Sequence, residues 1–389
     1  MITLQTADNA LKSAYLDVVS EQLNLQANPF LAKIKQTTEN VWGKDVRQVV
    51  QYGINGGVGA GTEDGSLPTS SSNQYQQIAV TLKNLYGTIE ISDKAIRASE
   101  NNAGAFVNLL NAEMEGLIKA STFNLGRMLF GDGTGALADI IAVDGNVLTV
   151  TSVKNFAEGM IIDVYYEDTP LPYAQGIKVL AIDRINKKIT VSGDYSSEAI
   201  IEESVAYVQG SKDQEITGLG AIFNTYSDTL YGLNKNENSW LKPYVINGVS
   251  EITEMKIQEV IDFLDDNYGS KVDMIICSSG VKRALQEHLS AYRRNIDVME
   301  LQGGMKTISF NGIPVVADRF CPKGHMYLLN SKDFALHQLC DWKWLEGEDG
   351  RVIKQVANKP VFKATLVKYA ELLCSRPCAQ GLLMGITEK

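Results

Sequence analysis

The chain has 389 residues, a formal net charge of -10 and 44% hydrophobic residues, a composition that is ordinary for a globular protein with a proper core. The acidic balance argues against a dedicated nucleic-acid binder, whose usual footprint is a basic patch, but it is compatible with a protein that merely encloses nucleic acid. No apolar run approaches the roughly 18 residues of a membrane span, and the N-terminus lacks the pattern of a signal peptide, so we expect residence in a cytoplasm.

The first 44 residues predict an N-terminal arm. Asp8 can cap a helix that carries Leu11, Tyr15 and Val18. An Asn-Pro step at residues 28–29 ends this helix, and Phe30 follows. Because a terminal apolar helix must bury its apolar face, we expect the arm to dock on its own domain or on a neighbour.

Residues 45–92 predict an extended hairpin with a polar tip. The valine-rich segment 45–52 is typical of a strand, and residues 78–92 return as one long strand or two. The stretch 53–77 between them is rich in glycine and serine, and no basic residue lies between Arg47 and Lys83. A loop of this length is either functional or disordered.

A long amphipathic helix is predicted from about residue 101 to 130, within a segment bounded at 93–138. Its apolar face would carry Phe106, Leu110, Met114, Leu117, Leu125 and Met128. Its polar face would carry Glu113, Glu115, Lys119, Asn124 and Arg127. At about 1.5 Å per residue the helix is a rod of roughly 40 Å. Asn101 and Asn102 can cap its start, Gly131-Asp132-Gly133 stops it, and Gly116 and Gly126 predict a bend or close packing.

Residues 139–214 predict a small all-β module, a barrel or a sandwich, inserted after the long helix. Asp144-Gly145 lies between two valine-rich segments, which indicates a hairpin. Further strands are expected at 160–166, 177–183, 187–192 and 204–208, each bounded by turn residues.

The remainder mixes strands and helices, so the fold class is α+β. Within residues 215–320 we expect helices at 251–267 and 279–289, a buried strand at 272–277 and a hairpin around Asn311-Gly312. Residues 321–389 supply return strands. No internal repeat is present in the sequence.

Motifs for cofactors and metals are weak. The glycine-rich segments 57–61 and 131–135 lie in a hairpin tip and at a helix end, whereas a nucleotide loop follows a strand and opens a helix. Cys321, His325, His337 and Cys340 have zinc-like spacing, but an offset of three along a regular strand places His337 and Cys340 on opposite faces. The odd number of cysteines favours buried free thiols over a disulfide framework. We therefore expect no catalytic residue, no cofactor and no metal.

The predicted arm, extended hairpin and long helix are projecting elements whose surfaces one subunit cannot bury by itself. Asp262, Asp265 and Asp266 cluster near the end of one helix, where carboxylates are slightly unfavourable. They would face a partner, a cation or solvent. The combination of few catalytic motifs with projecting elements points toward assembly.

The order of these elements resembles the major capsid proteins of tailed bacteriophages, the Hong-Kong-ninety-seven type fold that is shared with encapsulins and the herpesvirus capsid floor. The likeness lies first in the arm and in the glycine-rich hairpin at 45–92, which is similar to the E-loop of the family. It lies also in the long helix, which is similar to the spine helix of the family and ends in Leu129-Phe130-Gly131-Asp132-Gly133. It continues in Ile216-Thr217-Gly218-Leu219-Gly220 and in the segment 308–318, ISFNGIPVVAD, followed by 322–328, PKGHMYL.

The resemblance implies pentamers and hexamers that form through an axial domain at 215–320 and build an icosahedral shell around double-stranded DNA. The E-loop would lie over a neighbouring subunit, and the arm would tie capsomers together. The implied interface residues are Tyr52, Gly56, Gly59, Glu63, Asp64, Leu67, Phe30, Asp265 and Asp266. The hairpin tip has no lysine, which argues against the covalent cross-link of some relatives at that position.

The partners implied are other copies of the chain, a separate scaffolding protein, a portal, decoration proteins and packaged DNA bound without sequence preference, with no membrane. The location would be the virion capsid, and the host cytoplasm during assembly. Three alternatives remain open: an encapsulin-like compartment of the same fold, an α/β enzyme that depends on residues such as Cys277 or Cys321, and a tail or decoration protein.

Overall fold

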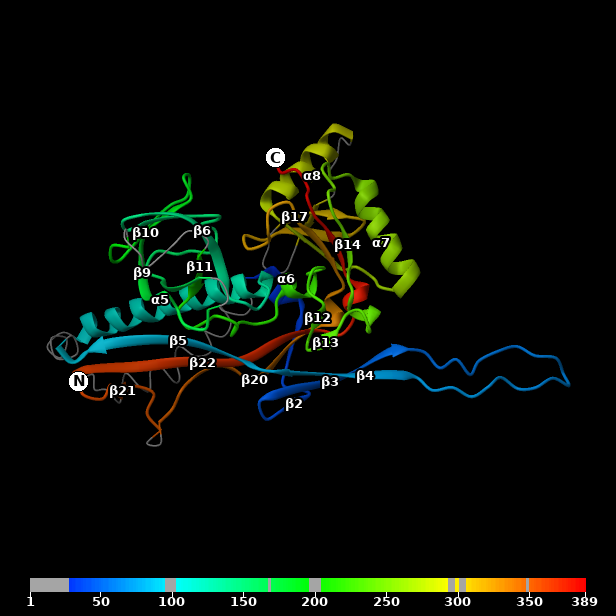
Figure 1. Ribbon diagram of the computed structural model, residues 1–389, viewed down its shortest axis with the longest axis horizontal. Coiled ribbons are helices and arrows are strands. Elements are labelled where there is room, and N and C mark those ends of the chain that lie inside the picture. Colours follow the sequence, from blue (N-terminus) through cyan, green and yellow to red (C-terminus); the bar gives the residue numbers. More distant parts are fainter. Residues whose placement is uncertain are drawn as a thin grey trace.

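The computed structural model describes residues 28–94, 103–166, 169–195, 204–292, 298–300, 306–347 and 350–389. The chain forms an elongated molecule in which a barrel and an α/β domain stand side by side above a long sheet, and a thin loop projects from one end (Figure 1). The predicted α+β class is confirmed. The predicted arm helix with Asp8, and the caps Asn101 and Asn102, lie outside the described residues.

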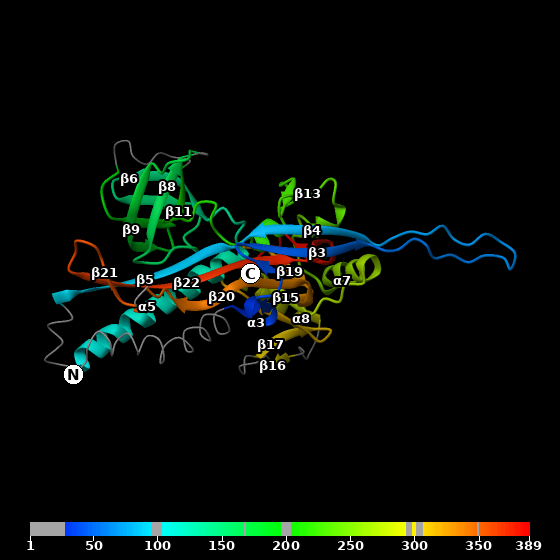
Figure 2. The ribbon, with the colours of Figure 1, turned by 90° about the horizontal axis from the view of Figure 1, so that it is seen from below.

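The long sheet is organised around one central strand, β22 (Val361–Cys374). It pairs antiparallel with β5 (Lys83–Ser92) on one side, and with β20 (Phe334–Trp344) and the short β21 (Lys354–Gln355) on the other; β1 (Lys35–Thr37) pairs parallel with β20. The helix α5 (Ala103–Phe130) runs along this sheet (Figure 2). Gly87 of β5 permits the close approach, because a Cβ there would lie 2.8 Å from Leu117 Cδ1.

The E-loop hairpin is shorter than predicted. Strand β3 (Asp45–Gly53) pairs antiparallel with β4 (Gln74–Thr81), and β2 (Val41–Trp42) pairs with β3. The hairpin therefore ends at Thr81 and does not include residues 83–92, which form β5 in the other sheet. The separation occurs at Leu82, whose side chain is buried and whose N–H donates to the Lys44 carbonyl at 2.9 Å.

The long helix matches its predicted extent, and Glu113, Glu115 and Lys119 of its predicted polar face are exposed. Its last turns are buried on all sides, and Arg127, which we placed on the exposed face, is buried. Gly126 is a site of close packing, since a Cβ there would lie 2.6 Å from the Phe320 ring, whereas Gly116 is exposed with no neighbour within 4 Å of such a Cβ.

Residues 136–208 form a closed six-stranded barrel. Its strands are β6 (Ala136–Asp144), β7 (Val147–Val150), β8 (Ile161–Tyr166), β9 (Ala174–Asp183), β10 (Lys188–Val191) and β11 (Ser204–Val208), in the order β10-β7-β6-β11-β8-β9. Its interior is filled by apolar side chains such as Leu148, Phe156, Ile162 and Val164. The barrel starts at Ala136 directly after the glycine-rich turn, slightly before the expected boundary at residue 139.

The α/β domain contains a seven-stranded mixed sheet. Its strand order is β14 (Tyr244–Ile246), β23 (Gly381–Leu383), β19 (Met326–Leu329), β15 (Met274–Cys277), β18 (Ile313–Ala317), β17 (Lys306–Phe310) and β16 (Val298–Glu300). The helices α7 (Glu254–Tyr268) and α8 (Ser279–Tyr292) pack on it. Gly269 ends α7 with a φ of 58°, and Asn311 and Gly312, at 50° and 79°, make the tight turn of the predicted hairpin.

The remaining elements are short. They are α3 (Pro29–Lys33), α6 (Leu219–Ile222), β12 (Thr229–Leu230), β13 (Leu233–Asn234), and the 3-10 turns η2 (Ser239–Leu241), η3 (Ser331–Asp333) and η4 (Pro377–Ala379). Most of them pack into the core that joins the long sheet to the α/β domain.

Candidate assembly surfaces

The tip of the E-loop hairpin projects from the molecule without regular strands (Figure 1). Its two legs nevertheless run close together: a Cβ on Gly57 would lie 3.1 Å from the Ser71 N, and one on Gly59 would lie 3.2 Å from the Pro68 ring. At the end, Gly65 N donates to the Thr62 carbonyl at 3.1 Å. The glycines therefore allow a narrow, extended loop closed by a turn at residues 62–65.

Five predicted interface residues lie on this projecting loop, and all are exposed. Gly56 and Gly59 lie on one leg, Glu63 and Asp64 form the turn, and Leu67 follows it. Leu67 is 90% exposed. The sequence interpretation missed Ile54 and Val58, which are 85% and 87% exposed on the same loop. An apolar residue inside a glycine-rich tip was the available signal, because such a tip has no core to bury it.

Tyr52 lies at the root of the loop. Its ring stacks on Trp240 of η2, with the ring centroids 6.2 Å apart and the planes at 15°. The Tyr52 hydroxyl also lies 3.5 Å from Gln74 Oε1 across the hairpin. Tyr52 thus contacts its own α/β domain, and half of its surface remains exposed.

Phe30 is not on the surface. Asn28 caps α3 by accepting hydrogen bonds from the N–H groups of Phe30 and Leu31, at 2.9 and 3.2 Å. This cap turns Phe30 inward, where it is fully buried with its ring edge-on to Phe334 at a centroid distance of 5.3 Å. Phe30 therefore cannot contact a neighbouring subunit, and the interface prediction for this residue is wrong.

Asp265 and Asp266 are exposed in the last turn of α7. The Asp265 carbonyl accepts the Gly269 N–H at 2.8 Å, which completes the helix end. Their carboxylates stand at the negative end of the helix dipole, where an added negative charge is slightly unfavourable. The two side chains are free to face a partner or solvent.

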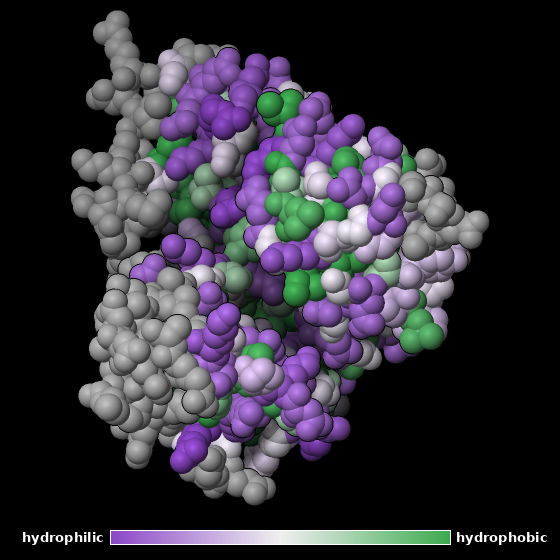
Figure 3. Space-filling model, turned by 90° about the vertical axis from the view of Figure 1, so that its left-hand side faces the viewer, coloured by the Kyte–Doolittle hydropathy of each residue, from purple (hydrophilic) through white to green (hydrophobic). Residues whose placement is uncertain are grey.

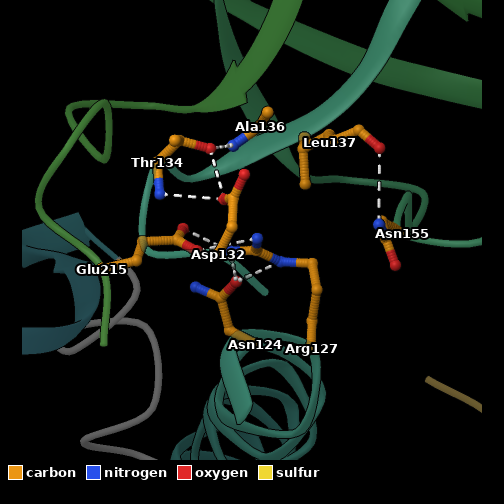
Figure 4. A network of polar contacts seen from close by, with 8 residues as sticks. All are labelled: Asn124, Arg127, Asp132, Thr134, Ala136, Leu137, Asn155 and Glu215. Carbon is orange, nitrogen blue, oxygen red and sulfur yellow. Dashed lines mark hydrogen bonds and ion pairs between the residues drawn. The ribbon is translucent and has the colours of Figure 1, made fainter. Parts of the chain in front are cut away.

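The barrel is joined to the rest of the chain at a buried ion pair (Figure 4). Arg127 of α5 donates through Nη1 to Glu215 Oε2 at 2.8 Å and through Nη2 to Glu215 Oε1. Arg127 also donates to Asn124 Oδ1, through Nη2 at 2.9 Å and through Nε at 3.3 Å. The side chains of Arg127 and Glu215 are 3% and 2% exposed.

The two connections of the barrel cross at this ion pair. Asp213 N donates to the Thr134 carbonyl at 2.8 Å, which ties the outgoing connection to the returning one. Gly218 packs on the end of α5, because a Cβ there would lie 2.6 Å from the Gly131 carbonyl oxygen and closer still to that of Met128. The motif at residues 131–135 is thus a crossing point that requires small residues, as well as a helix stop.

A groove of about 1,310 Å³ separates the barrel from α5 and β5. Its lining mixes apolar residues such as Phe123 and Phe156 with charged ones such as Lys119 and Arg184. Figure 3, seen from this end of the molecule, shows a hollow with apolar and polar side chains around it. This mixed lining does not select one ligand.

The side chains considered for catalysis are poorly placed for it. Burial raises the pKa of the Cys277 thiol to about 12 and also raises the pKa of Cys321, so the reactive thiolate is scarce at neutral pH. Burial lowers the pKa of both His325 and His337, whose Nδ1 atoms contact the carbonyls of Lys323 and Glu39.

His337 and Cys340, two of the residues with zinc-like spacing, do not lie on the regular strand that we expected. His337 is buried and Cys340 half-buried on β20, which is irregular between Gln338 and Cys340, so the regular-strand argument does not apply there. Within the described part of the chain, no three His, Cys, Asp or Glu side chains group to hold a metal ion. No helix among the described residues is long and apolar enough to span a membrane.

Comparison with known proteins gives structural likeness only. No protein-family model and no curated protein matches the chain. A chain of the cyanophage A-1(L) capsid asymmetric unit is 13% identical, with a TM-score of 0.54 over 95% of this chain and 93% of that one.

Two further solved structures are more distant. A chain of Mycobacterium phage Bobi is 9% identical with a TM-score of 0.47 over 100% of both chains, and an encapsulin of Synechococcus elongatus is 10% identical with a TM-score of 0.47 over 95% of both. The fold assignment is based on the cyanophage chain, whose likeness extends over nearly the whole length. The chain therefore has the fold of the cyanophage capsid chain, the Hong-Kong-ninety-seven type capsid fold.

Proposed function

We propose that this chain is a major capsid protein that assembles into pentamers and hexamers of an icosahedral shell, and that the shell encloses a double-stranded DNA genome. The observation that carries the proposal is the E-loop, which exposes Ile54, Val58 and Leu67 beyond the reach of the subunit's own core. Three exposed apolar side chains gathered on one projecting loop suit an interaction site, because exposed apolar surface that gathers in one place favours association.

The energy available from the loop supports this role. Fully burying one large aliphatic side chain is worth about 1.5–3 kcal/mol, so three of them contribute on the order of 4–9 kcal/mol per subunit before the cost of ordering. Since every subunit of a shell both gives and receives one loop, this contribution repeats around each capsomer. A second surface for contacts within a capsomer is the end of α7, with Asp265 and Asp266.

The partners of the shell follow from the same proposal. A portal would admit the DNA, a separate scaffolding protein would guide assembly, and decoration proteins would bind the finished shell. The chain carries a net charge of -10, so the packaged DNA would be held without tight binding to this protein. The protein would be found in the virion, and in the host cytoplasm during assembly.

Electron microscopy of the purified chain, alone and coexpressed with its phage's scaffolding protein, tests the proposal. Icosahedral particles built of pentamers and hexamers are expected, and only small oligomers under both conditions would overturn it. Uniform shells from the chain alone would remove the need for a scaffold. Shells isolated from infected cells should protect DNA from nuclease, whereas a protein cargo would favour an encapsulin-like compartment.

A matched pair of variants tests the role of the loop. Leu67→Ser removes an apolar side chain from the E-loop, and Ile185→Ser removes one from the barrel, where Ile185 is 91% exposed. Both subunits should fold with unchanged circular dichroism. We expect Leu67→Ser to lower the yield of shells and Ile185→Ser to leave it unchanged; equal yields from both variants would contradict the proposed contact of the loop.

A further inference from the structure

A second cavity, of about 390 Å³, lies between the barrel and the α/β domain. Its wall contains four basic residues from separate segments: Arg127 at the end of α5, Lys154 and Lys187 of the barrel, and Lys323 of the α/β domain. Among the described residues that line it there is no carboxylate. This is unusual in a chain whose acidic residues outnumber its basic ones.

The four cations are not equally available. Arg127 is engaged by Glu215, so its charge is largely balanced. Lys154 is partly buried and donates from Nζ to the Cys321 carbonyl, which is a neutral acceptor. Lys187 and Lys323 are exposed, and within the described part of the chain neither forms an ion pair. Three lysines therefore line one cavity whose described wall contains no carboxylate.

Two carboxylates outside the cavity wall act on its lysines. Asp318 acts electrostatically on Lys154, and Glu388 on both Lys154 and Lys323, but neither carboxylate lines the cavity. Asp318 Oδ2 is buried without a hydrogen-bond partner among the described residues. Asp318 Oδ1 accepts the Phe320 N–H at 2.8 Å, and Glu388 Oε1 accepts the Gly324 N–H at 2.9 Å. Asp132, close to Arg127, turns to Thr134 (Figure 4), whose N–H and hydroxyl donate to it at 3.0 and 2.6 Å.

Hydroxyl groups complete the lining. Thr151 Oγ1 accepts the Asp139 N–H at 3.2 Å, and Ser152 Oγ accepts the Lys154 N–H at 3.3 Å. A hydroxyl that accepts one hydrogen bond still has its own proton to donate. The cavity thus offers ammonium and hydroxyl donors, the groups that bind the oxygens of phosphate.

We propose that this cavity binds a phosphate-bearing anion, which holds the barrel against the α/β domain. Lys154 and Lys187 belong to the barrel and Lys323 to the α/β domain, so an anion between them replaces a repulsion across the interface with two attractions. The cavity volume admits a pyrophosphate group or a short phosphodiester. The anion is either a free phosphate or pyrophosphate, or a phosphate of the DNA backbone.

Titration calorimetry of the purified, unassembled full-length chain with sodium pyrophosphate tests the proposal, at constant ionic strength and with chloride as the counter-ion. The test variant is Lys187→Gln with Lys323→Gln. The control is Lys178→Gln with Lys343→Gln, which removes two exposed lysines outside the cavity and changes the net charge equally.

We expect saturable binding at one site in the unaltered chain and the control, and at least tenfold weaker binding in the test variant. The melting temperature should rise with pyrophosphate, but not with sodium chloride of equal ionic strength, and this rise should be lost only in the test variant. Binding that does not saturate, or that is equal in both variants, would overturn the proposal.

Competition identifies the source of the phosphate. If the natural ligand is the DNA backbone, a short duplex should displace pyrophosphate from the unaltered chain; if it is a free anion, the duplex should leave pyrophosphate binding unchanged. Both results presuppose the loss of affinity in the test variant. Because the measurement uses unassembled subunits, its failure is distinguishable from a failure of shell assembly.

Discussion

The ion pair between Arg127 and Glu215 allows a quantitative prediction about how the barrel is attached. The pair is bidentate, both side chains are almost completely buried, and Asn124 adds a further acceptor. Truncation of one partner leaves the other charge buried without a counter-ion, which typically costs about 3–5 kcal/mol. We therefore expect Arg127→Met and Glu215→Leu each to destabilise the subunit by about that amount.

The double variant should behave differently from the sum of the two. Replacing both charges by apolar side chains of similar volume removes the desolvation penalty together with the attraction, and such exchanges are often neutral or stabilising. The double variant should thus recover most of the loss, with a coupling energy on the order of 3 kcal/mol between the two sites. Asn124 limits the recovery, because its Oδ1 loses the Arg127 donors.

Urea denaturation of the unassembled subunit, followed by circular dichroism, measures these changes, with the slope checked for constancy between variants. Lys119→Met on the exposed face of α5 is the control for the loss of one cation. If the two single losses simply add in the double variant, the two side chains do not act as a pair, and the argument that they fasten the barrel connection fails.

Three further outcomes are expected. Gly218→Ala should destabilise the subunit by about 3 kcal/mol or more in urea denaturation, because the added Cβ meets the backbone of the end of α5; an unchanged midpoint would refute the crossing-point argument. Burial raises the pKa of Glu371 from 4.5 to about 7, so its contribution to stability is fully present below pH 4.5 and is lost as the pH rises through 7. In the unaltered chain the free energy of unfolding should fall by an amount on the order of a few kcal/mol over that window. Glu371→Gln cannot ionise, so this fall should be absent in the variant. Parallel profiles of unfolding free energy against pH in the two proteins would contradict this. Tyr52→Ala should leave the melting temperature almost unchanged but speed hydrogen exchange at the root of the E-loop, since the stack on Trp240 is lost; slower or equal exchange would show that the stack does not hold the loop.

Local sequence patterns predicted those turns and helix ends whose geometry depends only on neighbouring residues. The turn at Asn311-Gly312 needs two positive φ angles, and the end of α7 needs the left-handed Gly269; both are visible in the residue types alone. The glycine-rich hairpin tip was also predictable, because a stretch that consists mainly of glycine and small polar residues cannot supply a core.

Non-local contacts were not predictable in this way. From the sequence, the residues after Leu82 could have continued the hairpin of β3 and β4. They form β5 in the other sheet because they pair with β22, which lies far along the chain. Arg127 looked like a residue of the polar face because its partner, Glu215, is 88 positions away. Phe30 was taken for a contact between subunits because its partner, Phe334, is even more remote along the chain.

The path of the chain through β4, Leu82 and β5 has a mechanical consequence. The projecting loop and the long sheet are nearly collinear (Figure 1), and β5 is hydrogen-bonded to β22 from Lys83 to Ser92. Hydrogen bonds between antiparallel strands stand perpendicular to the strands. A pull on the loop along its length therefore loads the β5–β22 ladder in shear, and its bonds share the force instead of opening one after another. Tension applied at the tip would be carried into the β5–β22 ladder, past the barrel and the α/β domain, without peeling a strand from its sheet.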